Sequence, residues 1–92
     1  MEEKAFLLHI DSIFHICGRG TVVTGRVQEG SIKQYDELEI VADNTVIKTR
    51  CMLLEKYQKI ITEAHTGEYI AVYLENVSRT DIPYKAKLIR KR

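Results

Sequence analysis

The sequence predicts an all-β fold, a small closed antiparallel β-barrel of six or seven strands, and three observations lead to this expectation. Short runs of β-branched and other apolar residues fill most of the 92-residue chain. Glycine, asparagine, aspartate and proline separate these runs at short intervals, as turn residues do. The length suits one domain, residues 1–92, whose sheet can remove its exposed edges by closing on itself.

The expected strands follow one another from the amino end. Residues 36–41, DELEIV, show the pattern most clearly, because apolar and acidic side chains alternate with a period of two. The other expected strands lie within 5–14, 21–28, 45–54, 68–77 and 85–91. Turns are expected at 18–20, 29–30, 43–44, 65–67 and 81–83.

Residues 53–65, LLEKYQKIITEAH, are the one segment that also fits a helix. Its apolar residues recur at spacings of three and four, which is typical of an amphipathic helix. However, no serine, threonine, aspartate or asparagine immediately precedes the segment to cap such a helix. KIITEA reads equally well as a short strand after a bend, so we predict strands here.

Several functional classes are disfavoured by composition. The sequence contains no apolar run of about 18 residues, and its acidic start, MEEK, lacks the basic region of a signal peptide. We therefore expect a cytoplasmic protein without a membrane partner. Cys17 and Cys51 fit no metal-ligand spacing and are expected to be free, buried or half-buried thiols. The histidines also lack metal-binding spacing, so no metal or other cofactor is expected: His9, His15, His65.

Charge is distributed unevenly along the chain. Residues 1–46 carry a balance of −4 and residues 47–92 a balance of +5, and the basic end is KAKLIRKR. This end, which includes Arg90, is interpreted either as a nucleic-acid contact or as an edge strand protected by charge. Four tyrosines interleave with the basic half, and they fit either an RNA platform or rings that cap the core: Tyr57, Tyr69, Tyr73, Tyr84.

The segment GRGTVVTGRV, residues 18–27, is tested first as a phosphate-binding loop. Gly20 and Gly25 have the spacing of such a loop, but Arg26 and Val27 follow them where a lysine and a hydroxyl residue are needed. Strand-like flanks also replace the helix that would bind phosphate. We therefore expect no nucleotide binding by this chain alone, and predict a hairpin whose glycines, Gly18 and Gly20, adopt positive φ.

A longer stretch around this hairpin carries a family resemblance. Residues 11–41, DSIFHICGRGTVVTGRVQEGSIKQYDELEIV, closely resemble the start of the second domain of translational GTPases such as elongation factor Tu. The likeness continues less strictly through Cys51, Glu55, EAHTGEYIAVYL and VSRTDIPYKAKL, and so covers nearly the whole chain. The resemblance implies a Greek-key barrel that performs no chemistry, binds the aminoacylated end of transfer RNA and packs on neighbouring domains.

The resemblance also implies which residues bind. Arg19 falls in the turn that touches ribosomal RNA in the family, where it is expected to contact a phosphate or to be a solvated turn residue. Phe14, Thr24 and Glu55 fall where the family lines its pocket for the aminoacyl end. They supply an aromatic wall, a hydrogen-bonding hydroxyl and a carboxylate near the terminal adenosine; Phe14 is also a candidate for the core.

Departures from the family pattern limit what is carried over. Ser12 replaces an aspartate and Tyr69 an asparagine, which argues against specific recognition of the amino acid. Tyr35 and Lys85 replace turn glycines, so either these turns are remodelled or a residue with a side chain adopts positive φ. The sequence also lacks the guanine-reading Asn-Lys-x-Asp motif of a GTPase.

Two functional classes follow from the sequence. The first is a non-catalytic module that binds RNA, the ribosome or a protein of the translation machinery. The second is a protein-interaction barrel that kept the fold without RNA binding. An enzyme is not expected, because no nucleophile and base or metal-ligand cluster stands out in the sequence.

Overall fold

The structure, a computed structural model, describes residues 5–90. Its first strands are β1 (Phe6–His9), β2 (Ser12–Ile16), β3 (Gly20–Glu29), β4 (Ser31–Lys33) and β5 (Glu37–Ala42). They are followed by β6 (Thr45–Lys56), β7 (Lys59–Ile61), β8 (Glu63–His65), β9 (Tyr69–Leu74), the 3-10 helix η1 (Arg79–Asp81) and β10 (Lys87–Arg90). No helix within residues 5–90 is long and apolar enough to cross a membrane.

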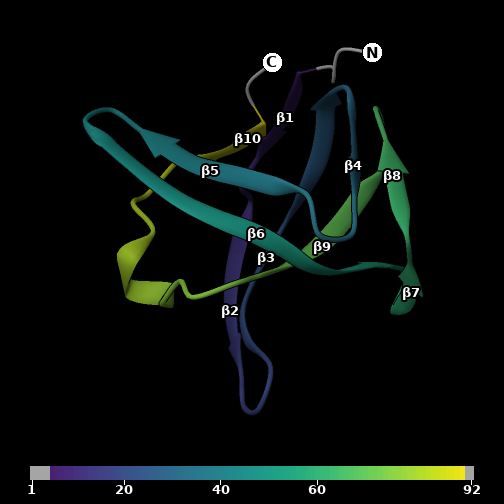
Figure 1. Ribbon diagram of the computed structural model, residues 1–92, viewed down its shortest axis with the longest axis horizontal. Helices are drawn as coiled ribbons and strands as arrows, with labels where there is room; N and C mark the ends of the chain where they lie inside the picture. The colour runs from purple at the N-terminus through teal and green to yellow at the C-terminus, as the bar shows by residue number, and fades with distance from the viewer. Residues whose placement is uncertain (1–4, 91–92) are drawn as a thin grey trace.

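Six antiparallel strands close into a barrel in the order β1-β10-β5-β6-β9-β3, and β3 returns to β1 through the pairing of Leu8 with Val27 (Figure 1). Strands β5, β6 and β9 are sequential in this order, and β10 returns to lie beside β5, which is a Greek key. The predicted closed Greek-key barrel is therefore confirmed. Strands β2 and β7 extend one sheet beyond the barrel, and β4 and β8 form a separate pair.

The barrel interior collects the alternate apolar residues of these strands. In β5, Leu38 and Ile40 are buried while Glu37 is exposed, as the period of two predicts. The neighbouring strands add fully buried aliphatic and aromatic side chains, among them Phe6, Leu8, Val23, Leu54, Val72 and Leu88. Burial of these side chains is the main stabilising contribution to the barrel.

The single apolar strand expected in 5–14 is two strands in the structure. The break lies at Ile10 and Asp11, whose backbone N–H groups donate to the carbonyls of Ala86 and Thr24. Strand β1 stays in the barrel, whereas β2 leaves it with β3 as a projecting hairpin (Figure 1). Gly25 permits this geometry, because a Cβ atom there would lie 2.2 Å from the carbonyl oxygen of His9.

The strand prediction for residues 53–65 is confirmed. Strand β6 runs to Lys56, and Tyr57 and Gln58 turn the chain back into β7 with φ of +54° and +64°. Positive φ at both central residues is the mark of a type I′ hairpin turn. The helix-like spacing of apolar residues is explained by pairing across this hairpin, where Leu54 lies opposite Ile61.

Tyr35 and Lys85, which stand where the family resemblance has turn glycines, adopt an unusual backbone conformation. Tyr35 has φ of +75° and Lys85 has φ of +62°, both in the left-handed region. These turns are therefore kept by residues with side chains that adopt positive φ, which is the second of the two alternatives. This conformation is strained for a residue with a side chain, and the surrounding barrel maintains it.

Candidate functional site

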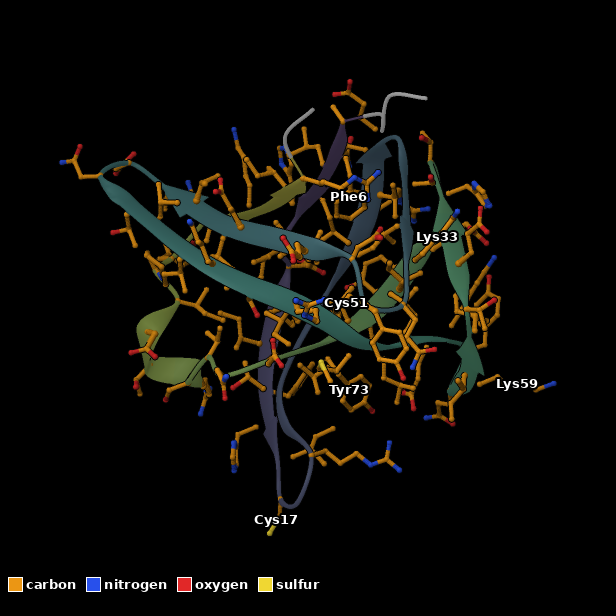
Figure 2. The ribbon with its side chains drawn as sticks, in the orientation of Figure 1. Phe6, Cys17, Lys33, Cys51, Lys59 and Tyr73 are labelled. Atoms are coloured by element: carbon orange, nitrogen blue, oxygen red, sulfur yellow. The ribbon has the colours of Figure 1, made fainter. Side chains whose placement is uncertain are left out.

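The β2–β3 hairpin ends in a tight turn that the glycines make possible. The N–H of Arg19 donates to the carbonyl of Ile16 at 2.9 Å, and Gly18 and Gly20 have φ of +81° and +93°. A Cβ atom on either glycine would meet no atom within 4 Å, so the backbone dihedral and not crowding favours glycine. Cys17 lies at the tip of this hairpin (Figure 2).

One face of the sheet formed by β2, β3, β9 and β6 brings together three predicted site residues. Phe14 lies opposite Val22, which lies opposite Tyr73, and in the next row Thr24 lies opposite Ala71, which lies opposite Glu55. The alternate residues of these strands face the barrel interior, so this set faces outward. We call these residues the outer sheet face: Phe14, Val22, Thr24, Glu55, Tyr73.

Tyr73 connects the predicted residues Arg19 and Glu55. It is only 7% exposed although it belongs to the outer sheet face. The Arg19 guanidinium carbon lies 5.8 Å from the centroid of its ring, and the Glu55 carboxylate lies near its hydroxyl. Burial, together with the nearby Glu55 carboxylate, raises the pKa of Tyr73. In Figure 2, Tyr73 lies on the side of the barrel from which the hairpin extends.

A second network engages Thr24. The Tyr69 hydroxyl donates to the Asp11 carboxylate at 2.6 Å and lies 3.3 Å from the Thr24 hydroxyl oxygen. The hydrogen bond to Asp11 raises the pKa of Tyr69. The Arg26 guanidinium lies over the Tyr69 ring, 5.8 Å from its centroid, and donates to the carbonyl of Gly67. A ligand that uses the Thr24 hydroxyl must therefore share it with Tyr69.

Exposed apolar side chains lie at both edges of the outer sheet face. Phe14 is 50% exposed, so the alternative that it belongs to the core is wrong. Ile16, two residues further along β2, is 38% exposed, and Ile60, opposite Glu55 on β7, is 63% exposed. Val22 is buried on this face while Val23 enters the barrel core, so the Val-Val pair is divided between the two faces.

Arg90 lies apart from the outer sheet face. Its guanidinium donates to the Asp36 carboxylate at 2.6 Å and to the Ser31 carbonyl at 2.9 Å, and it lies 5.9 Å from the centroid of Phe6. Its side chain is only 11% exposed. Arg90 therefore joins β10 to the β4–β5 region. Of the other tail cations, Lys85 and Lys87 are exposed, while Lys91 and Arg92 lie outside the described residues.

The remaining singled-out residues divide by exposure. Both cysteines are free; Cys51 is buried as expected, but Cys17 is exposed. The three histidines are exposed, and His65 lies 3.1 Å from the Glu63 carboxylate. Tyr57 and Tyr84 are 86% and 87% exposed, each with a neighbouring lysine over its ring, so neither caps the core.

The arrangement is suited to non-covalent binding. It offers an exposed aromatic ring, a guanidinium, a hydroxyl and a carboxylate on one accessible surface. The sequence identified these four residues but not the position of Tyr73 between Arg19 and Glu55. The one sequence signal for Tyr73 is the period of two, which places it on the same face of β9 as Ala71. A scan against models of known protein families finds none that matches this chain.

Proposed function

We propose that this protein is a non-catalytic binding module, related to the second domain of translation elongation factors, that binds RNA or the translation machinery through its outer sheet face and hairpin tip. One observation carries the proposal. Phe14, Thr24 and Glu55 come from three strands and share one face, and Tyr73 on the same face lies beneath the Arg19 guanidinium. These are the residues that the family resemblance assigns to binding.

The chemistry of these side chains fits an RNA end. The half-exposed Phe14 ring can stack on an unpaired base, a contact that every base allows. Arg19 is exposed in the hairpin turn, and Arg26 is exposed on β3. Their guanidinium groups offer paired donors to phosphate oxygens. Phosphate contacts of this kind dominate affinity for nucleic acid and make it dependent on salt.

The Asp11–Tyr69–Thr24 hydrogen-bond network limits which ligand groups can bind beside Thr24. The Thr24 hydroxyl and the Tyr69 hydroxyl lie 3.3 Å apart, and Asp11 accepts from Tyr69, so the polar groups at this end are already paired. A ligand would gain little from hydrogen bonds here unless it displaced one of them. We therefore propose binding of RNA through stacking and phosphate contacts, without specific recognition of an attached amino acid.

Protein binding is the second candidate, and the exposed apolar residues favour it. Ile16 and Ile60 are 38% and 63% exposed on the same side as Phe14, which is a feature of protein docking surfaces. The two candidates differ in how they respond to salt. RNA binding weakens steeply as salt is raised, whereas apolar docking does not.

Fluorescence anisotropy with a labelled single-stranded RNA, measured across a salt series, tests the proposal. We expect Arg19→Ala to weaken binding several-fold and to reduce the slope of log K against log salt by about one. The matched control is Arg50→Ala, since Arg50 forms ion pairs with Glu37 and Glu75 away from this face. No RNA binding at low salt would refute the RNA proposal, and salt-insensitive capture of a purified translation protein would favour the second candidate.

A further inference from the structure

Strand β2 leaves one edge of the sheet open. The sheet order ends at β2, and β3 is its only paired neighbour within residues 5–90. The backbone groups of alternate residues along Ser12–Ile16 therefore point away from the sheet. Phe14, His15 and Ile16 are exposed on this strand. An edge of this kind is a template for pairing with another chain.

The other edges of the described structure are protected. Strand β7 is three residues long and begins with a lysine, and the β4–β8 pair is equally short and carries Lys33 and Glu63. Short length and charge are the usual means by which proteins prevent unwanted strand pairing. Strand β2, with the sequence SIFHI, is longer and contains neither a Lys, Arg, Asp or Glu residue nor a proline. Its lack of protection distinguishes it as a pairing site.

A groove of about 460 Å³ runs beside the start of this edge. Residues 10–13 form one wall, and Arg79, Tyr84 and Lys85 form the other. The Thr21 hydroxyl, on the inward side of the hairpin, donates to the carbonyl of Val77 and so holds the segment that leads into η1 against this side. A strand added to β2 would thus have cations beside its inward-side residues and Phe14 and Ile16 beside its outward-side residues.

The charges of the groove indicate which partner it fits. Arg79 and Lys85 are exposed, while Asp11 directs its carboxylate to the Tyr69 hydroxyl, beside Thr24, and Asp81 directs its carboxylate to the N–H of Ser78. We propose that the β2 edge binds an extended segment of a protein partner in which acidic and apolar residues alternate. The acidic residues face Arg79 and Lys85, and the apolar residues continue the surface of Phe14 and Ile16.

A second copy of this chain is a poorer occupant. Self-pairing through β2 would place the Ser-Ile-Phe-His-Ile strands of two copies side by side, which supplies no acidic residue from either strand. In an antiparallel pair of β2 strands, Arg79 and Lys85 of each copy would lie beside the Ile16 end of the other copy, where they find no carboxylate on that strand. An acidic peptide instead neutralises these charges. The inference does not depend on RNA binding by the outer sheet face.

The test is an NMR titration of the full chain with a synthetic ten-residue peptide of alternating valine and glutamate. We expect amide shifts to change at Ser12–Ile16 and between Arg79 and Lys85. Two further peptides carry N-methyl groups on all valine nitrogens or on all glutamate nitrogens. Because only alternate N–H groups of an added strand face its neighbour, one of these peptides should lose roughly tenfold or more in affinity while the other binds normally.

Charge reversal provides the second arm. The double variant Arg79→Glu/Lys85→Glu should weaken the peptide roughly tenfold, whereas Lys48→Glu/Lys59→Glu, which reverses two exposed lysines elsewhere, should leave binding unchanged. Equal binding of the two methylated peptides would overturn strand addition. So would shifts confined to Val22, Thr24, Glu55 and Tyr73, dimerisation of the chain through β2, or an oligoribonucleotide that produces the same shifts between Arg79 and Lys85.

Discussion

The closed barrel and the hairpin that projects from it contain the same three residue types in opposite settings. In the barrel, a glycine, an arginine and a cysteine are surrounded by other atoms: Gly25, Arg90, Cys51. In the hairpin turn, the same residue types are open to solvent: Gly18, Arg19, Cys17. Burial, and not residue type, therefore distinguishes the residues that stabilise the barrel from those that are available for binding. Each pair provides a test of this division.

The glycine pair should show the largest difference. Gly25→Ala places a Cβ atom 2.2 Å from a backbone carbonyl of His9, which can move only if β1 separates from β3, so we expect a loss of roughly 4 kcal/mol. Gly18→Ala meets no atom within 4 Å and costs only its φ of +81°, about 1 kcal/mol. Urea denaturation of the two variants measures both values, and equal losses would contradict the comparison.

The arginine pair should come next. Arg90→Ala leaves Asp36, a carboxylate that is only 20% exposed in its ion pair, without its cation, so we expect a loss of roughly 3 kcal/mol. Arg19→Ala removes one exposed cation from the ring of Tyr73 and should cost less than about 1 kcal/mol.

Thermal and urea unfolding of both arginine variants test this difference. Arg90→Lys is the matched control, because it keeps the charge but cannot donate as a fork to both Asp36 and Ser31, and it should recover only part of the loss. A fully stable Arg90→Ala variant would contradict the stabilising role assigned to this ion pair.

The cysteine pair should give the smallest effect, and only at alkaline pH. Burial raises the pKa of the Cys51 thiol from 9.0 to about 12. The unfolded chain ionises first, so the contribution of this thiol to stability is complete below pH 9 and is lost as pH rises toward 12. At about pH 10.5 the loss relative to pH 8 should be roughly 2 kcal/mol.

The measurement is the free energy of unfolding of the wild type minus that of Cys51→Ala, followed against pH. Tyrosines and lysines that titrate in this range are common to both proteins and cancel in the difference. Cys17→Ala controls for the removal of a thiol as such, because Cys17 is exposed at the hairpin tip. A difference that does not change between pH 8 and pH 10.5 would contradict the assigned burial effect.

Local sequence patterns were sufficient for the fold, because strand alternation and turn residues are read over a few neighbouring positions. The period of two placed Leu38 and Ile40 inside, and the glycines located the hairpin turn. The break at Ile10 and Asp11 was missed, since it depends on contacts with Ala86 and Thr24 rather than on any local turn signal.

The site was predictable in part. Phe14, Thr24 and Glu55 were identified by resemblance, and the strand register places them together. The ion pair of Arg90 could not be predicted, because Asp36 lies 54 residues away and charge patterns along the chain do not reveal such partners. The position of Tyr73 between Arg19 and Glu55 likewise depends on the order of strands in the sheet.

The break between β1 and β2 has a consequence for how this protein can diverge. The barrel is closed by the pairings of β1 with β10 and β3, and β2 lies outside this closure, so the turn at Cys17 and Gly18 is separated from the pairings of β1. Lengthening such a turn costs little, because the entropy of closing a loop grows only slowly with its length. Insertions in this turn can therefore change which partner the hairpin contacts while the barrel continues to fold.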